Sequence, residues 1–201
     1  MTTTEQPASL ISTLPGQYYT DPAVFALEQT RVFETMWFCA VRSADLPTPG
    51  SFRKVQVGRE SVLVVRSRDG QLRAFLNVCR HRGAQICTEE SGAVKRAFQC
   101  PYHAWTYDLE GKLIAAPNLT KMPDIDRVEY GLIPVALREW LGYAWVCLAK
   151  EPRPFEDEVI ADVVERLGDV ESIESTSPRR STTSATTSSN GAGSFARHTH
   201  A

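Results

Sequence analysis

Two short pairs of cysteine and histidine lie close together in the middle of the sequence. The first pair is Cys79 and His81, in the run Cys-Arg-His-Arg-Gly. The second pair is Cys100 and His103, in the run Cys-Pro-Tyr-His-Ala-Trp, and residues 82–99 separate the two pairs. Thiolates and neutral imidazoles are both good ligands for transition metals. Two of each make a full set of protein ligands for one metal centre.

The mixed composition of each pair bears on which centre this is. Zinc sites of the Cys₂His₂ type usually join like with like, Cys-x₂₋₄-Cys followed by His-x₃₋₅-His. A Rieske [2Fe–2S] cluster instead has two thiolates on one iron and two imidazoles on the other. Two loops that each supply one Cys and one His can hold such a cluster from both sides. The pattern favours the Rieske cluster, while a zinc site and four residues in unrelated roles stay open as alternatives.

The residues around both pairs resemble the N-terminal Rieske domain of the ring-hydroxylating oxygenase α-subunits, which are Rieske non-heme iron oxygenases. The similarity extends upstream over Ala-Phe-Leu-Asn-Val at 74–78 and downstream over residues 106–113, and it covers roughly residues 14–152. The resemblance implies an oxidoreductase that binds its [2Fe–2S] cluster through Cys79, His81, Cys100 and His103.

Two positions refine the resemblance. The Rieske proteins of respiratory and photosynthetic complexes carry two extra cysteines that form a disulfide beside the cluster, where this sequence has Ala84 and Tyr102. The resemblance therefore implies the disulfide-free, lower-potential type, because fewer donors near the sulfurs and more solvent lower the potential. The amino-acid sequence of residues 53–66 and 75–83 is similar to that of the oxygenase subgroup that oxidises quaternary ammonium compounds.

Residues beside the expected ligands have expected roles as well. Arg80 and Arg82 flank His81 and would favour electron uptake by compensating the added negative charge. Trp105 and Tyr107 would pack beneath the cluster and keep water out, and plain core packing is the equal alternative.

Short apolar segments between glycine and proline turns surround the two pairs. Turn signals such as Gly58-Arg59 and Asp69-Gly70 predict antiparallel hairpins. This pattern predicts an all-β core, a Rieske-type antiparallel sandwich or barrel, whose two cluster-binding loops rise from strand ends. The strands are expected over residues 37–41, 51–57, 61–66, 72–77, 94–99, 104–107, 112–114, 132–137 and 143–148.

Helices are expected on both sides of this core. Asp21 followed by Pro22 is typical of a helix start, and by the resemblance this helix would pack on a catalytic domain. Residues 156–167 predict a short acidic helix, and the Ser/Thr-rich stretch 172–190 predicts disorder. We therefore expect an N-terminal extension with a helix at 1–40, a Rieske domain at 41–150, and the acidic helix with a tail at 151–201.

The composition of the 201 residues is ordinary, with a net charge of −2. No apolar run reaches the ~18 residues of a membrane span, and the N-terminus lacks the pattern of a secretory signal. Cys39, Cys87 and Cys147, which the cluster does not claim, are expected to be buried free thiols in a reducing compartment. We predict a cytoplasmic protein without a membrane or nucleic-acid partner.

Charge is unevenly distributed along the chain. Residues 53–96 hold ten basic and four acidic side chains, and residues 151–174 hold nine acidic and two basic ones. Such runs are often only solvated surface, but they would also steer an acidic redox partner to the basic end that carries the cluster. The resemblance implies that this partner is a flavin- or ferredoxin-type reductase that uses NAD(P)H.

The resemblance also implies a catalytic domain that these residues do not contain. In the oxygenases, two histidines and one carboxylate hold a mononuclear Fe(II) with open positions. His198 and His200 have the wrong spacing for that motif. We therefore expect this chain alone to pass electrons from a reductase to an iron site outside it, and to form a trimer only if the catalytic domain were present. A free-standing ferredoxin-like carrier and a zinc-binding module without redox function are the alternatives.

Overall fold

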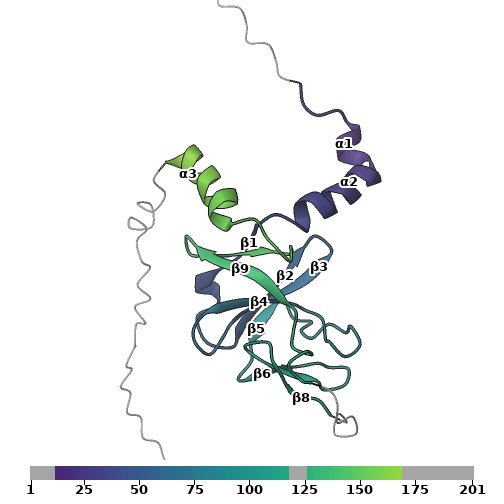
Figure 1. The fold of residues 1–201 in the computed structure, drawn as a ribbon, viewed down its shortest axis with the longest axis vertical. Helices are drawn as coiled ribbons and strands as arrows, with labels where there is room; N and C mark the ends of the chain where they lie inside the picture. The colour runs from purple at the N-terminus through teal and green to yellow at the C-terminus, as the bar shows by residue number, and fades with distance from the viewer. Residues whose placement is uncertain (1–11, 118–125, 169–201) are drawn as a thin grey trace, which may run out of the picture.

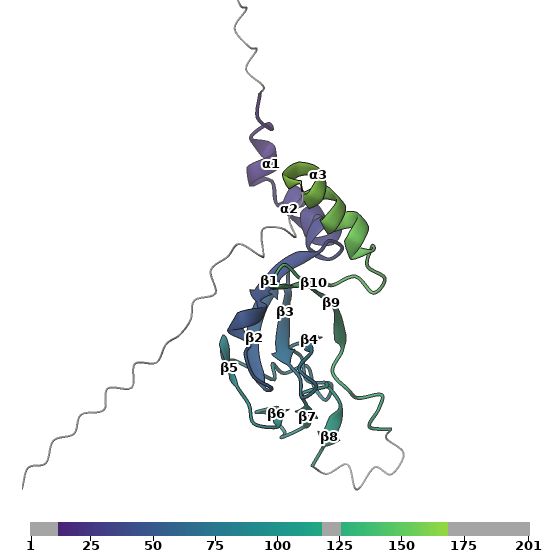
Figure 2. The same cartoon turned by 90° about the vertical axis from the view of Figure 1, so that its left-hand side faces the viewer.

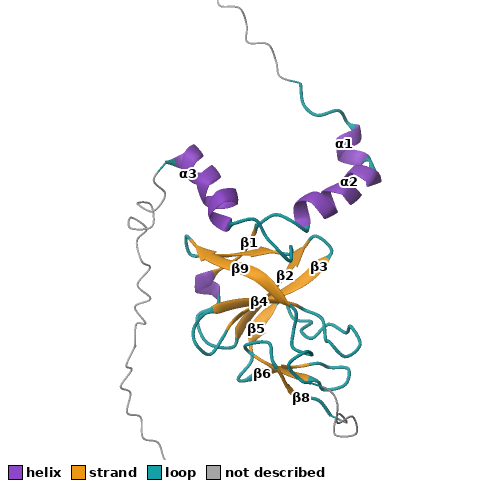
Figure 3. Cartoon of the chain, in the orientation of Figure 1, coloured by secondary structure: helices purple, strands orange, loops and turns teal. Residues whose placement is uncertain are grey.

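The computed structural model describes residues 12–117 and 126–168 of the chain. They form a curled antiparallel β domain with helical segments at one end (Figures 1 and 3). The larger sheet has seven strands in the order β1-β10-β9-β4-β3-β2-β5, and the smaller sheet has three in the order β6-β7-β8. The predicted all-β core with a helix on each side is confirmed.

The expected strands are present within a few residues, apart from the one over 94–99. Residues 94–96 instead carry the chain from β5, which pairs with β2, to β6, which pairs with β7 in the other sheet. Only the second half of the expected strand is therefore confirmed, as β6, because residues 94–96 belong to neither sheet. The larger sheet consists of β1 (Phe38–Arg42), β2 (Ser51–Val57), β3 (Glu60–Arg66), β4 (Leu72–Leu76), β5 (Ser91–Ala93), β9 (Pro134–Trp140) and β10 (Tyr143–Cys147). The smaller sheet consists of β6 (Ala97–Gln99), β7 (Thr106–Asp108) and β8 (Leu113–Ala115).

Strand β3 holds the two halves of the core together because both of its faces are buried. Val62 and Val64 face one apolar cluster, with residues of β1, β9 and β10. Leu63 and Val65 face a second cluster that includes Cys79 and residues of the smaller sheet. All four of these β3 side chains are fully buried. Burial on both faces explains the continuous apolar run of this strand.

Two helical arms leave the same end of the β domain, opposite the smaller sheet (Figures 1 and 2). The N-terminal arm consists of α1 (Gln17–Thr20), α2 (Pro22–Glu28) and the π-helical turn η1 (Gln29–Phe33). The C-terminal arm consists of the π-helical turn η4 (Glu156–Ile160) and α3 (Ala161–Leu167). The predicted helix start is confirmed, since the carboxylate of Asp21 accepts a hydrogen bond from the N–H of Ala23 at 2.8 Å. A short 3₁₀ turn, η2 (Ser43–Asp45), follows β1.

An aromatic socket joins the C-terminal arm to the sheet. The ring of Phe155 lies edge-on to the rings of Trp37, Trp140 and Trp145, with centroids 5.2, 5.8 and 5.7 Å away. Trp37 also donates its indole N–H to the carbonyl of Arg153 at 2.9 Å, so it ties the two arms together. None of the helices in the described ranges is long and apolar enough to cross a membrane. The Ser/Thr-rich tail predicted at 172–190 lies outside the described residues.

Candidate functional site

The two Cys/His pairs lie on two loops that approach each other at the end of the domain away from the arms. The first ligand loop, residues 78–87, follows β4, and the second ligand loop, residues 100–105, connects β6 to β7. Cys79 and Cys100 are both buried in the same apolar cluster. The imidazole rings of His81 and His103 lie edge to face with centroids 4.6 Å apart. The fold thus brings the two cysteines into one apolar cluster and the two imidazoles into contact with each other.

The two ligand loops repeat one backbone pattern. In the first, the N–H of Cys79 donates to the carbonyl of Ala84 at 2.8 Å, and the N–H of Gly83 donates to the carbonyl of Cys79 at 3.0 Å. In the second, Cys100 donates to Trp105 at 2.8 Å, and Ala104 donates back to Cys100 at 3.0 Å. Each cysteine therefore starts a tight turn that is closed on itself, and the histidine lies on that turn.

The same position of each turn has a left-handed backbone. It is Gly83 in the first loop, at φ +72°, and Ala104 in the second, at φ +57°. Glycine reaches this region freely, whereas for alanine it is strained. Strained residues persist at functional sites when the surrounding structure holds them in place. The second ligand loop therefore stores strain immediately after His103.

Tyr107 on β7 contacts the first ligand loop with its hydroxyl group. The oxygen accepts a hydrogen bond from the N–H of Arg80 at 3.0 Å and lies 3.3 Å from the Sγ of Cys79. Burial raises the pKa of Tyr107, and the hydrogen bond with Cys79 raises it further, so the hydroxyl keeps its proton. When Cys79 is a thiolate, the sulfur must be the acceptor of that proton. Sequence reasoning assigned Tyr107 a packing role and missed this donor, because nothing in the sequence shows where a tyrosine hydroxyl points.

Aromatic rings enclose the two imidazoles. Trp105 stacks on His81 with a centroid distance of 4.9 Å and an interplanar angle of 14°. Tyr102 lies against His103 at 3.9 Å but is itself 61% exposed. Tyr130 meets Trp105 edge-on at 5.7 Å. Trp105 is buried in the apolar cluster that contains both cysteines, whereas His81 is exposed and His103 is half-buried.

The surroundings of Cys79 and His81 shift the pKa of each side chain. Burial raises the pKa of the Cys79 thiol, and the neighbouring Cys100 raises it further against the effect of Tyr107. The pKa of His81 is lowered by desolvation and then by the charges of His103 and Arg82. A neutral imidazole is the form that binds metals, whereas each thiol must lose a proton on binding. Cluster assembly is therefore expected to release protons from the cysteines rather than from His81.

The residues fit a two-iron cluster better than a single ion. The Nδ1 atom of His103 is buried and has no hydrogen-bond partner, which costs free energy unless a ligand satisfies it. Over residues 12–117 and 126–168, no three Cys, His, Asp or Glu side chains converge on one metal position. One zinc ion would need such convergence. Two buried thiols on one side and two imidazoles on the other instead match the two ends of a Rieske cluster.

The remaining cysteines differ from the expectation in one case. Cys87 and Cys147 are buried free thiols as predicted, and none of the five cysteines forms a disulfide. Cys39, which was expected to be buried, is exposed on β1. Its neighbours Phe38 and Ala40 both pack against the core, so Cys39 between them lies on the outer face of this edge strand. Cys147 donates its S–H to the carbonyl of Thr35 at 3.3 Å and so helps to anchor the N-terminal arm.

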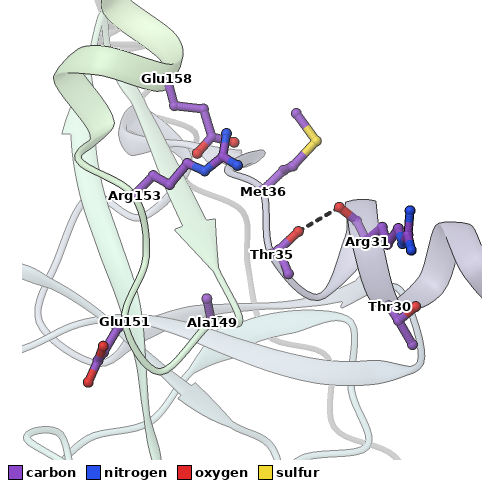
Figure 4. Close-up of a pocket in the computed structure, with 8 residues that line it drawn as sticks. All are labelled: Thr30, Arg31, Thr35, Met36, Ala149, Glu151, Arg153 and Glu158. Atoms are coloured by element: carbon purple, nitrogen blue, oxygen red, sulfur yellow. Dashed lines mark hydrogen bonds between the residues drawn. The ribbon is translucent and has the colours of Figure 1, made fainter.

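A cavity of about 500 Å³ lies at the root of the two arms, far from the ligand loops. Figure 4 shows that one wall comes from the N-terminal arm and the residues after it, and the other from residues 149–158. The side chains of Arg153 and Glu158 point toward one another across its upper part (Figure 4). The cavity belongs to the junction of the arms and contains none of the predicted site residues.

Comparison with known proteins agrees with this geometry. The profile of the Rieske [2Fe-2S] domain matches residues 36–129. The glycine betaine monooxygenase oxygenase subunit of Pseudomonas aeruginosa PAO1 is 40% identical over 145 residues, which are 72% of this chain and 33% of that protein. The carnitine monooxygenase oxygenase subunit of Escherichia coli K12 is 36% identical over 147 residues, which are 73% of this chain and 39% of that protein.

Solved structures give the same result. The quaternary ammonium Rieske monooxygenase CntA in complex with L-carnitine has a TM-score of 0.71 and 32% identity, covering 77% of this chain and 44% of that chain. Naphthalene 1,2-dioxygenase with indole bound has a TM-score of 0.64 and 30% identity, covering 70% of this chain and 32% of that chain. The chain thus spans between a third and a half of the length of these relatives. Residues 36–129 are a Rieske [2Fe-2S] domain, and the relatives of the chain are Rieske oxygenase subunits.

Proposed function

We propose that the β domain transfers single electrons through a [2Fe–2S] cluster held by the two ligand loops. Cys79 and Cys100 would hold the inner iron as thiolates, and His81 and His103 would hold the outer iron. The observation that carries this proposal is the pairing of two buried thiols with two imidazoles in edge-to-face contact on two facing loops. The cluster supplies one-electron redox chemistry when it is bound.

The residues around the cluster have separate tasks in this function. Tyr107 donates to the Cys79 sulfur, and such a donor stabilises the more negative, reduced state. Trp105 covers His81 and excludes water from one side of the site. The imidazoles at the rim of the domain give the electron its shortest path in and out, because the thiolate side is buried.

The electron's destination is an oxygenase iron centre in this proposal. The sequence similarity to glycine betaine and carnitine monooxygenase subunits supports a quaternary ammonium compound as the substrate of the complete enzyme. Exposed apolar side chains on the arms, such as Tyr19, Phe25 and Leu167, favour this reading over a free-standing carrier. A free-standing electron carrier would not need two helical arms that expose apolar side chains to solvent.

The electron's source is a reductase of the flavin or ferredoxin type that oxidises NAD(P)H. Arg80 and Arg82 are exposed beside His81 and give this end of the domain a positive potential. A positive surface accelerates encounter with an acidic protein by electrostatic steering.

Iron and acid-labile sulfide analysis of the anaerobically purified chain tests the proposal. We expect about two irons and two sulfides per chain and an electron paramagnetic resonance (EPR) signal after reduction. A stoichiometric amount of zinc, with neither iron nor visible absorbance, would exclude the electron-transfer function. Adding a reductase and NAD(P)H should bleach the cluster without forming an oxygenated product, because no open iron site is among the residues that we assign.

A further inference from the structure

We propose that Asn77 is a positioning residue for the cluster. Its side-chain amide fixes the first ligand loop by joining the two ends of that loop, which we call its neck. Asn77 directly follows β4 and precedes Cys79 by two residues. It touches neither the ligands nor the expected metal, so it would act only through the loop that carries them. The inference rests on the proposed [2Fe–2S] site and names a residue that the motif itself does not include.

The side chain of Asn77 is fully buried and makes four hydrogen bonds. Its Nδ2 donates to the carbonyl of Cys87 at 2.7 Å and to the Oγ of Ser61 at 3.2 Å. Its Oδ1 accepts from the N–H of Ile86 at 3.2 Å and from that of Cys87 at 2.9 Å. A primary amide has two donors and two acceptor sites, so its full capacity is used.

Three of these four bonds go to the returning end of the first ligand loop. The chain leaves the sheet at Asn77 and comes back at Ile86 and Cys87, and the amide bridges the two points. Apart from the Val78–Gln85 bridge, the turn that starts at Cys79 has only two internal backbone bonds. The neck, where residue 77 meets residues 86 and 87, is therefore held by the Asn77 amide beside a single backbone bridge, whereas a hairpin would be held by a ladder of backbone bonds.

The fourth bond anchors this bridge to the scaffold. Ser61 lies on β3, and its carbonyl also accepts the backbone N–H of Asn77 at 2.8 Å. Removing the Ser61 hydroxyl would take away one long bond on the scaffold side and leave all three loop bonds intact. Ser61 and Asn77 therefore form a matched pair in which only one member holds the loop.

The position of Cys79 depends on this neck. The contact between the Cys79 sulfur and the Tyr107 hydroxyl is made across the loop, at 3.3 Å. Hydrogen bonds to cluster sulfurs tune the reduction potential, and a loop that moves would make that bond long or intermittent. Loss of Asn77 should therefore change the electronic properties of the cluster, whereas a residue needed only for stability would leave them unchanged.

The experiment compares the full-length N77A, N77D and S61A variants with the parent chain, all purified anaerobically. For N77A we expect a lower midpoint potential, a broadened EPR signal, and amide hydrogen exchange over residues 79–87 that is faster by at least about tenfold, because three bonds to the loop are lost. S61A should match the parent chain in all three. At pH 6, N77D should lie close to the parent, because burial favours its neutral form, which can still donate to Cys87.

Two outcomes would overturn the inference. One is an N77A protein that is less stable but keeps the parent's potential and EPR line shape. The other is an S61A protein that changes as much as N77A does. If N77A does not accumulate, N77S decides, because the shorter serine side chain has one donor and cannot replace the three loop bonds of the amide, and an N77S protein with the parent's potential and EPR line shape would contradict the proposal. Absence of a cluster from the parent chain would instead refute the proposed function, and hydrogen exchange of the neck would still test Asn77.

Discussion

The hydroxyl oxygen of Tyr107 lies 3.3 Å from the sulfur of Cys79 and accepts the N–H of Arg80, so one side chain contacts two consecutive residues of the first ligand loop. Once Cys79 is a thiolate, its sulfur can only accept a hydrogen bond, so the Tyr107 hydroxyl must be the donor. Strand β7 follows the second ligand loop, and through Tyr107 it also contacts the first ligand loop.

We expect Y107F to keep its cluster but to have a lower midpoint potential, because the reduced state loses a hydrogen bond to the sulfur. The N–H of Arg80 also loses its acceptor, which should lower the free energy of unfolding by about 1–3 kcal/mol. Redox titration followed by EPR measures the first effect. Y143F, at a half-exposed tyrosine on β10, is the control, and equal potentials for the two variants would show that the contact has no redox effect.

The cysteine variants test the ligands directly. C79S and C100S should lose the visible absorbance and the iron of the cluster and should unfold more readily, since metal binding contributes to folding free energy. C87S should keep its absorbance, because the Cys87 side chain contacts the carbonyl of Glu89 and lies outside both pairs. Unchanged absorbance in either C79S or C100S would mean that the ligands are wrongly assigned.

Ala104 offers a test of backbone strain in the second ligand loop. A104G should retain the cluster, since glycine adopts the observed φ of +57° without cost. A104V should fail to incorporate iron, because a β-branched residue is a clear outlier at positive φ. A97V in β6, where a β-branched residue suits an extended strand, serves as the control. Iron content decides, and a fully loaded A104V protein would contradict the strained geometry.

Electrostatic steering predicts a salt effect on reduction by an acidic reductase. The rate should fall between ~0.1 M and ~1 M salt, as the Debye length shrinks from ~10 Å to ~3 Å. Replacing Arg80 and Arg82 by Gln should flatten this dependence, and R166Q on the distant C-terminal arm should not. Stopped-flow absorbance measures the rates, and a salt-independent rate in the parent chain would remove the steering argument while leaving the cluster in place.

The aromatic socket predicts a local loss of stability. F155A should free the C-terminal arm from the sheet at a cost of about 3–5 kcal/mol, the usual range for a buried Phe. Hydrogen exchange over residues 156–167 should accelerate while the cluster absorbance stays unchanged. F25A, at an exposed ring on α2, should change stability by no more than about 0.5 kcal/mol. Loss of the cluster in F155A would show that the two ends of the domain are coupled.

Much of the site could be predicted from the sequence because the ligands of each pair lie within a few residues of each other. Two Cys/His pairs at short spacing, each preceded by a strand and flanked by turns, indicate the centre without knowledge of the fold. The amide of Asn77 and the hydroxyl of Tyr107 could not be assigned in the same way. Their partners lie up to 28 residues away, and the contact depends on how two sheets pack. The exposure of Cys39 depends likewise on which face of β1 turns outward.

The separation of the arms from the ligand loops has an optical consequence. Three of the four tryptophans surround Phe155 at the arm end, and the fourth, Trp105, stacks on His81 at the other. A visible chromophore in the ligand loops would quench Trp105 far more strongly than the distant three, because energy transfer falls steeply with distance. Ultraviolet emission from this chain would therefore report on the arms, and visible absorption would report on the redox centre. The two signals can be measured on one unlabelled sample, and each of them reports on a different end of the molecule.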